Sequence, residues 1–422
     1  MLRAAVAKAD ITPKNGEDLC GFAKRVGPTA GISDPLSTRW LCLENSSGKV
    51  LLGTADIISL TRGRFESLQK GIAKKAKVEA SSVCVGTSHT HSGPATVPLN
   101  HCGHMDTRYV SRLMTTLTQT AGKAGEGLAP VSVRVAQTQC PGIAINRRRP
   151  DSGPVDHTLT TIAFENPKNG KPVASIVHFA CHPVVLGHEN VMVSADFPGF
   201  LCSSIEQETG APCLFLNGAC GDINPAKAHS ADPQLARRTG EKLAQAALSS
   251  LQKKSRICEP DSVKVITHRI ALPVHVPKSA AYLVKQVKHA SEMFNLDPSL
   301  FDGELRHWTK LLEAGKFPST VTIKVSAMTL GREIALVFVP GEVFCEIGLR
   351  AKAASAFPTT LICGFSNGSV GYLPTSRSYK EGGYEPLVAH YFYRFPQFDP
   401  KIENVLVTGL ERLLVKAAKA AR

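Results

Sequence analysis

The chain has 422 residues, of which 43% are hydrophobic and 20% are charged, and its formal net charge is +14. This composition is typical of a globular protein with a large core, and no segment approaches the roughly 20 consecutive apolar residues of a membrane-spanning helix. The basic residues are spread along amphipathic helices, and no zinc-finger, RNA-binding-strand or basic-heptad pattern is present, which favours a solvated basic surface over a nucleic-acid, anionic-lipid or acidic-glycan partner.

Residues 1–13 form too short and too interrupted a segment to be a signal peptide. We therefore expect a cytoplasmic protein, unless a leader has been removed from the chain. The twelve cysteines include no C-x-x-C pair, and several, such as Cys84 and Cys363, lie in apolar runs where cysteine acts as a small hydrophobic residue. We expect no disulfide framework.

Strand and helix patterns alternate along the chain. Strands are expected over residues 39–44, 50–59, 82–86, 131–138, 158–164, 173–179, 213–216, 263–272, 321–329, 333–339 and 360–365. Helices are expected over residues 65–78, 109–122, 200–209, 234–252, 342–356 and 402–421, with a helical pair over 280–316. This alternation predicts an α/β fold with a mixed β-sheet core flanked by helices, in one domain of residues 1–422 with a helical excursion over about 274–320.

The stretch S-H-T-H-S-G-P, Ser88–Pro94, follows the buried strand expected at 82–86. It holds two histidines two residues apart, and imidazole is both a common metal ligand and a good proton carrier near neutral pH. A strand end fixes the direction of the residues that follow it. Taken alone, the pair is also compatible with two ordinary loop histidines.

Unusual polar residues follow four further expected strands. They are His182 in C-H-P, the loop Asn217–Pro225, Glu342 in P-G-E, and Tyr372 after a Gly/Ser loop. If the strands are neighbours and mostly parallel, these loops meet at one edge of the sheet, where ligands bind in open α/β folds. Imidazoles, a carboxylate and a phenol suit zinc, which accepts nitrogen and oxygen ligands.

Each of these residues also has a simpler explanation. His182 precedes a proline, which favours an extended backbone at a strand end. Glu342 is expected in the first turn of a helix, where the dipole favours a carboxylate. Tyr372 could serve packing, and the loop 217–225 could be a glycine-rich turn. Their recurrence at five strand ends favours a common site.

The ordered set of motifs resembles the neutral/alkaline non-lysosomal ceramidase family. The resemblance runs from Asp10-Ile11-Thr12 to about Glu385. Its motifs are Ser88–Pro94, Ile145-Asn146-Arg147, His182-Pro183, Ser194–Gly199, Gly221–Pro225, Pro340-Gly341-Glu342 and Gly371-Tyr372.

The resemblance implies an α/β catalytic domain that binds one Zn²⁺ ion and hydrolyses an amide bond. By position, the zinc ligands implied are His89, His182, Glu342 and Tyr372. His91 would then face the substrate and Tyr384 would lie beside the site.

Two features depart from the family. Its G-D/N-x-S-P pattern has a serine proposed as catalytic, where this chain has Asn224. Asparagine cannot be a nucleophile, but it can donate a hydrogen bond to a developing oxyanion. The family continues into a C-terminal immunoglobulin-like domain, whereas this chain ends in the basic helix expected at 410–422, so ceramide as the substrate does not follow.

The mechanism we expect is direct attack on an N-acyl carbonyl by zinc-bound water, whose pKa zinc lowers to roughly 7. His91 carries the proton to the leaving group, and Asn224 and Tyr384 stabilise the oxyanion. Asp222 and Asp196 orient the ligands, with Asp222 also assigned to the substrate site. Arg147 is expected to hold an anionic group of the substrate.

The substrate expected is a small or lipid-like N-acyl compound. Three alternatives use the same zinc site: an esterase, a lactonase or a sugar N-deacetylase. A further alternative is a non-catalytic zinc- or lipid-binding protein in which Asn224 marks lost activity.

Overall fold

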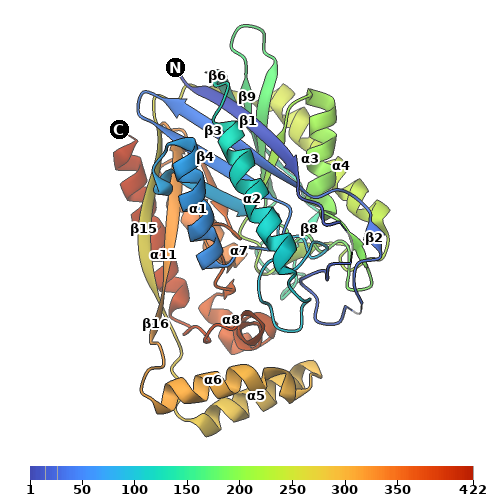
Figure 1. Ribbon diagram of the computed structural model, residues 1–422. Coiled ribbons are helices and arrows are strands. Elements are labelled where there is room, and N and C mark those ends of the chain that lie inside the picture. The colour runs from blue at the N-terminus through green and yellow to red at the C-terminus, as the bar shows by residue number, and fades with distance from the viewer. Residues whose placement is uncertain (15, 26, 422) are drawn as a thin grey trace.

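The computed structural model describes residues 1–14, 16–25 and 27–421. Within these ranges, two five-stranded sheets and one four-stranded sheet pack around a shared apolar core, with helices on their outer faces (Figure 1). A mixed β-sheet core flanked by helices, as the alternating pattern predicts, is therefore confirmed. None of the helices in the described ranges is long and apolar enough to cross a membrane.

The first sheet has the strand order β5-β4-β3-β1-β6, and its only parallel pair among the described strands is β4 with β5. Its outer face is covered by two helices that bury Phe65, Leu68 and Leu117 against it. The bounds are β1 Arg3–Asp10, β3 Ser37–Asn45, β4 Gly48–Ala55, α1 Arg62–Ala76, η1 Ala80–Ser82, β5 Val83–Thr87, α2 Thr107–Ala124 and β6 Ala129–Pro130.

The second sheet has the order β12-β10-β9-β7-β14 and pairs β10 with β12 in parallel. Helices α3 and α4 cover it through Phe197, Leu201 and Leu243. The bounds are β7 Ser132–Gln139, β9 Thr158–Glu165, β10 Pro172–Phe179, α3 Asp196–Thr209, β12 Cys213–Asn217, α4 Pro233–Lys254 and β14 Arg256–Cys258.

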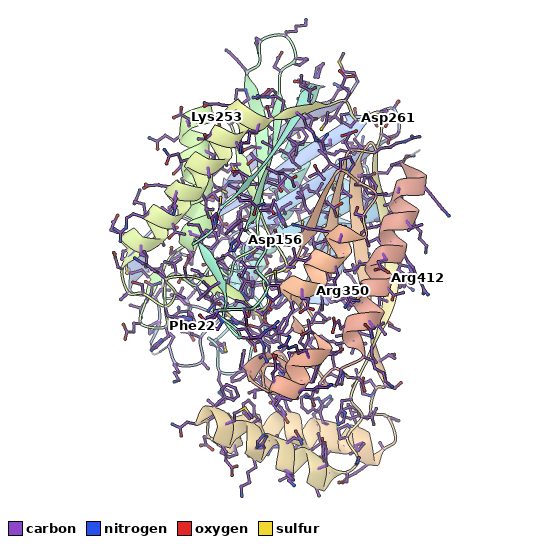
Figure 2. The ribbon with its side chains drawn as sticks, turned by 180° about the vertical axis from the view of Figure 1, so that it is seen from behind. Phe22, Asp156, Lys253, Asp261, Arg350 and Arg412 are labelled. Atoms are coloured by element: carbon purple, nitrogen blue, oxygen red, sulfur yellow. The ribbon has the colours of Figure 1, made fainter. Side chains whose placement is uncertain are left out.

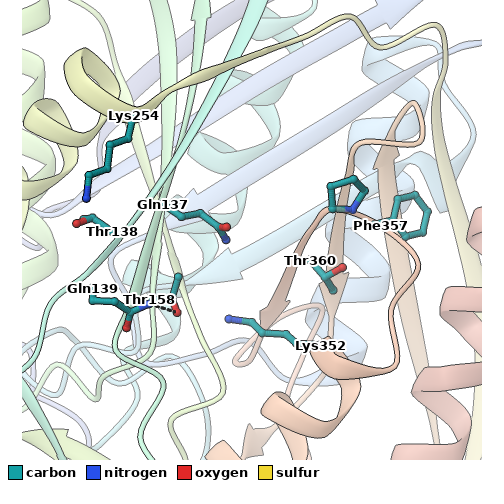
Figure 3. A pocket seen from close by; sticks show the side chains of 9 residues that line it. Gln137, Thr138, Gln139, Thr158, Lys254, Lys352, Phe357 and Thr360 are labelled. Carbon is teal, nitrogen blue, oxygen red and sulfur yellow. Dashed lines mark hydrogen bonds between the residues drawn. The ribbon is translucent and has the colours of Figure 1, made fainter.

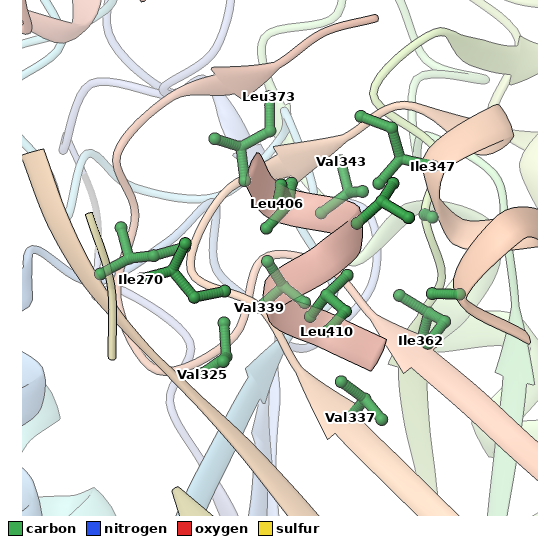
Figure 4. Close-up of a cluster of buried hydrophobic side chains, with 14 of the residues drawn as sticks. Ile270, Val325, Val337, Val339, Val343, Ile347, Ile362, Leu373, Leu406 and Leu410 are labelled. Carbon is green, nitrogen blue, oxygen red and sulfur yellow. The ribbon is translucent and has the colours of Figure 1, made fainter. Parts of the chain in front are cut away.

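The third sheet has the order β15-β16-β17-β19, with β17 and β19 parallel and an antiparallel hairpin joining β16 to β17. Helices α7 and α11 cover it, and Figure 4 shows Leu406 and Leu410 of α11 within the cluster of buried side chains that includes Val337 and Val343. The bounds are β15 Val263–Pro273, β16 Thr320–Leu330, β17 Ile334–Phe338, α7 Cys345–Ala353, β19 Thr359–Cys363 and α11 Ile402–Ala420.

Three short strand pairs and several short helices complete the loops. The pairs are β2 Gly31–Ile32 with β11 Met192–Val193, β8 Ala144–Asn146 with β13 Ile223–Pro225, and β18 Glu342–Val343 with β20 Tyr372–Leu373. The helical pair α5 Ala280–Phe294 and α6 Asp302–Glu313, joined by η2 Pro298–Phe301, lies beyond the sheets (Figure 1). It packs on α9 Tyr384–Leu387 and α10 Ala389–Tyr393, mainly through α10. Helix α8 is Ser376–Glu381.

Successive side chains of a strand point to opposite faces of the sheet, so each sheet contributes side chains to two hydrophobic cores. Leu41 and Leu43 face the shared core, whereas Trp40 and Cys42 face helices α1 and α2. Because side chains alternate across a strand, both faces of these buried strands are apolar. Each of the twelve cysteines, all within the described ranges, is buried and free, so the expected lack of a disulfide framework agrees with the structure.

Three details differ from the sequence analysis. The strands that carry the candidate site lie in three sheets, not in one mostly parallel sheet. The helix expected at 342–356 begins at Cys345, so Glu342 lies in strand β18 and not in a first helical turn. Strand β1 was not expected, because its sequence RAAVAKAD contains little of the β-branched and aromatic character of strands.

Candidate metal centre and adjoining cleft

Three histidines meet where loops leave the first and second sheets. His89 and His91 follow β5, and His182 follows β10; one ring nitrogen of each lies within 4.8 Å of the others. The Nε2 atoms of His89 and His91 are 3.2 Å apart. The two strand-end motifs therefore come together in space as their positions predict.

His89 is fixed by its backbone and by two contacts of its ring. Its φ of 68° lies in the left-handed region, which is rare for a residue other than glycine and is often found at functional sites. Its Nδ1–H donates to the Ile58 carbonyl over 2.7 Å. The Phe365 ring stacks on it, with 4.0 Å between centroids.

His182 is fixed in a similar way by the loop after β12. Its Nδ1–H donates to the Cys220 carbonyl over 2.6 Å, and its backbone N–H donates to the Ile223 carbonyl. With the proton on Nδ1, the Nε2 atom of a neutral ring has only a lone pair, because the hydrogen bond of one nitrogen sets the state of the other.

These lone pairs converge on a buried carboxylate. Glu342 Oε2 lies 3.0 Å from His182 Nε2 and 3.6 Å from His89 Nε2. Burial lowers the pKa of His89 to about 4 and that of His182 to about 3, so both rings are neutral at pH 7. Two imidazole lone pairs and a carboxylate that face one another are stabilised by a cation at their centre. The residues present therefore fit a metal ion.

Glu342 is held opposite Tyr372 by the parallel pairing of β18 with β20. Their neighbours Val343 and Leu373 are buried in the core of the third sheet, which anchors both strands (Figure 4). Burial raises the pKa of Glu342, and its neighbours, among them the hydroxyls of Tyr393 and Tyr372, oppose the rise. Tyr393 donates its hydroxyl hydrogen to Glu342 Oε1.

Arg147 links this group to the residues at the cleft. Its Nε donates to Glu385 over 2.8 Å, and its Nη2 donates to the Tyr372 hydroxyl over 3.0 Å. Its Nη1 donates to Asn224 Oδ1 over 3.1 Å. Most of its donors are therefore occupied within the protein, and its assignment to an anionic substrate group stays a prediction.

Asn224 lies in β13 at the wall of the cleft. Because its Oδ1 accepts from Arg147, its amide nitrogen is left as the donor, and no described residue accepts from it. Tyr384 lies nearby, with its ring 5.9 Å from that of Tyr372. The roles given to these residues in oxyanion stabilisation stay predictions that the geometry permits.

The two aspartates hold loops in place. Asp222 accepts from the backbone N–H of Cys345 over 2.7 Å and from the Asn146 side chain over 2.9 Å. Asp196 accepts from the backbone N–H groups of Leu186 and Phe197. Both oxygens of each carboxylate are engaged with the protein, so the assignment of Asp222 to the substrate stays untested.

A cleft of about 690 Å³ adjoins these residues. Its wall includes Arg147, Asn224, His229 and Tyr384. The Phe22 ring lies 4.9 Å from the His91 ring and 5.5 Å from that of His229, with both distances taken between centroids. Figure 2 shows Phe22 among the loops at the end of the molecule that carries the site.

A second cavity, of about 360 Å³, lies between the second and third sheets (Figure 3). Its polar lining includes Gln137, Gln139, Lys254 and Lys352. None of its lining residues belongs to the histidine group or to the cleft of about 690 Å³.

Several residues of the site were missed from the sequence. Phe365, Tyr393 and Glu385 contact His89, Glu342 and Arg147 respectively. Tyr393 and Glu385 lie in short helices, away from any strand end. The sequence offered one signal for such residues: a polar group within a run of aromatic residues that is expected to be buried. The hydroxyl of Tyr393 in Y-F-Y at 391–393 is an example.

Residues 3–225 match the sequence model of the N-terminal part of the neutral/alkaline non-lysosomal ceramidases. Two solved structures align over 99% of this chain and 75% of theirs at 14% identity: a ceramidase complexed with C2, with a TM-score of 0.78, and the neutral ceramidase from Pseudomonas aeruginosa, with 0.77. At this identity, the structural matches establish a shared fold.

Proposed function

The chain belongs to the neutral/alkaline non-lysosomal ceramidase family, a family of amide hydrolases, and we propose that it cleaves N-acyl amides at a zinc ion held by His89, His182, Glu342 and Tyr372. The observation that carries the proposal is the convergence of two unprotonated Nε2 atoms on Glu342 Oε2. Zinc, when bound, supplies Lewis-acid chemistry: it polarises a carbonyl and makes water more acidic.

In this proposal, His91 moves the proton from the attacking water to the leaving nitrogen. Gly21 packs against the edge of its ring at Nδ1, where a Cβ on that glycine would come within 2.5 Å. This contact leaves Nε2 as the atom that faces the centre, 3.2 Å from His89 Nε2. Burial keeps the pKa of His91 well below its usual value, so the ring is a neutral base before the reaction.

The cleft supplies the remaining functions. The amide nitrogen of Asn224 and the hydroxyl of Tyr384 are donors for the oxygen on which negative charge develops. Arg147, held by Glu385, orients Tyr372 and Asn224 at once. Burial raises the pKa of Tyr384 well above its usual value, so its hydroxyl keeps its proton and remains a donor.

The test is turnover of a panel of N-acyl amides, including ceramides, and of p-nitrophenyl esters. Each substrate is assayed with the purified protein, after removal of metal with a chelator, and after zinc is added back. We expect amide hydrolysis that disappears with the chelator and returns with zinc. Ester hydrolysis without any amide hydrolysis would favour the esterase alternative. No turnover of any substrate by zinc-loaded protein would contradict the hydrolase.

A further inference from the structure

Arg25 lies directly beside the proton carrier of the site. Its Nη1 donates to the His91 carbonyl over 2.7 Å and to the Cys20 carbonyl over 3.3 Å. Its Nη2 donates to the Gly187 carbonyl over 3.3 Å. The guanidinium thereby joins three loops around His91, and its position relative to that imidazole is fixed.

Arg25 differs from the other arginines of this region because it has no carboxylate partner. Arg147 and Arg148 pair with Glu385, and Arg149 lies 3.8 Å from Glu346. Within the described ranges, no carboxylate lies within 4.0 Å of the Arg25 guanidinium. Burial lowers the pKa of Arg25 to about 10, as expected for a charge that has lost water without gaining an anion.

One edge of the guanidinium remains available. The Nε atom of Arg25 is buried and has no hydrogen-bond partner, and its Nη2 group has used one of two hydrogens. Nε and Nη2 form the side-on fork that binds a carboxylate through two parallel hydrogen bonds. A buried donor without a partner costs stability, which a bound anion would recover.

The surroundings connect this fork to the cleft. The Phe22 ring lies 5.1 Å from Arg25 Cζ and also contacts the rings of His91 and His229. His229 lines the cleft of about 690 Å³. Phe22 therefore contacts the Arg25 guanidinium, the His91 ring and a residue of the cleft wall.

We propose that the leaving amine of the substrate carries a carboxylate and that Arg25 binds it through Nε and Nη2. The substrate class is then N-acyl amino acids, a proposal that rests on the amide hydrolysis proposed above. The carboxylate belongs to the amine portion because His91 delivers its proton to the leaving nitrogen, and Arg25 is joined to His91. Water adds its oxygen to the acyl carbon, the C–N bond breaks, and the products are a fatty or short carboxylate and a free amino acid.

The experiment compares N-hexanoylglycine with N-hexanoylglycinamide, which differ in the carboxylate alone. Binding is measured by calorimetry and turnover by kcat and KM, with zinc-loaded wild-type protein and the variants Arg25→Gln and Lys24→Gln. Lys24 is an exposed neighbour on the same loop. Lys24→Gln therefore also removes one positive charge, but it keeps the Nε and Nη2 donors of Arg25. Thermal unfolding of each variant confirms that it is folded.

We expect the wild type to bind the carboxylate at least tenfold more tightly than the amide, because hydrogen bonds between charged groups are stronger than those between neutral ones. In Arg25→Gln, the ratio of carboxylate to amide affinity, measured through Kd and KM, should fall to about one, whereas Lys24→Gln should keep the preference. A general collapse of the loop would weaken both substrates equally.

An unchanged preference in folded Arg25→Gln, or no preference in the wild type, overturns the inference. If the protein hydrolyses ceramide or the glycinamide but shows no preference for a carboxylate, the amide-hydrolase proposal stands. Only the role of Arg25 is then contradicted. Conversely, carboxylate-selective binding that depends on Arg25, without turnover of any amide, supports the anion site and contradicts the hydrolase.

Discussion

His89 and His182 each donate the Nδ1 proton to a backbone carbonyl, so each has only a lone pair to present to Glu342. Buried acceptors that face one another are costly unless a cation or a proton lies between them. The lowered pKa values of both rings show that neither imidazole supplies that proton, whereas burial raises the pKa of Glu342. At the scale of single residues, the three groups fit a metal ion, which is the occupant that we propose.

His182→Ala and His91→Ala should separate metal binding from proton transfer. We expect His182→Ala to lose zinc, because a ligand is removed, and His91→Ala to keep zinc while its kcat falls by roughly 10²–10⁴. Elemental analysis and kcat of both purified variants provide the measurement. Equal loss of zinc would show that His91, whose Nε2 lies 3.2 Å from that of His89, is itself a ligand.

Asn224→Ala tests the donor that replaces the serine of the family pattern. Its amide nitrogen is free to donate because its oxygen accepts from Arg147, and one oxyanion donor contributes roughly 10²–10³ in kcat. We expect kcat to fall by about that factor with zinc content unchanged, and we expect no acyl-enzyme. A burst of product equal to the enzyme concentration, or an acyl adduct in intact-mass spectra, would point to another nucleophile, with Ser88 and Ser92 examined first.

The sequence located the residues at strand ends but not those that support them. His89, His182, Glu342 and Tyr372 lie together because a strand end has a defined direction. Tyr393 reaches Glu342 from α10, and Arg25 reaches His91 from an irregular loop. Such contacts depend on tertiary packing, which no local pattern of residues encodes.

At the scale of elements, each sheet contributes a parallel pair of strands to the site. The pairs are β4 with β5, β10 with β12, and β17 with β19. The existence and approximate bounds of these strands were predictable from apolar runs. Their distribution over three sheets was not, because the pairing of strands is set by contacts far apart in the chain. The same reason explains the misplaced helix start: the Glu342 N–H donates to the Gly371 carbonyl, which draws that residue into β18.

The helical pair α5–α6 contacts α9 and α10 through several large side chains. One of them, Trp308, is buried, stacks on His390 with 5.5 Å between centroids, and lies tilted to Tyr391 at 5.4 Å. Trp308→Ala should cost about 3–5 kcal/mol of packing and loosen α10, which carries Tyr393. We expect faster hydrogen exchange over 280–313 and 389–393 and a lower kcat. Exposed His307→Ala is the control, and unchanged exchange over 389–393 would show that the helical pair is independent of the site.

At the scale of the whole molecule, His178 joins the second sheet to the third. It is buried on β10, and its Nε2 donates to the Ile362 carbonyl of β19 over 3.0 Å. Burial lowers its pKa to about 4, with a smaller contribution from Lys352 in the same direction. The unfolded chain then binds more protons than the folded one between pH 4 and 6.5, so this histidine makes stability fall as pH falls through that window.

We expect His178→Gln to remove that pH dependence. Between pH 7 and pH 5, the metal-free wild type should lose about 2 kcal/mol more unfolding free energy than His178→Gln, measured by urea unfolding. The exposed His289→Gln should follow the wild type. Parallel pH profiles for wild type and His178→Gln would show that His178 is protonated, or already exposed, in the folded protein.

Zinc should connect all three sheets, because its proposed ligands follow β5, β10, β17 and β19. An ion that binds only the folded chain stabilises it by about 4 kcal/mol at a free concentration 1,000 times its Kd. We expect one zinc per chain and a Tm that rises with buffered zinc and falls with a chelator. His182→Ala should lose this response, and exposed His104→Ala should keep it. If the wild type and His182→Ala respond alike, zinc binds elsewhere, and the convergence of His89, His182 and Glu342 serves the fold alone.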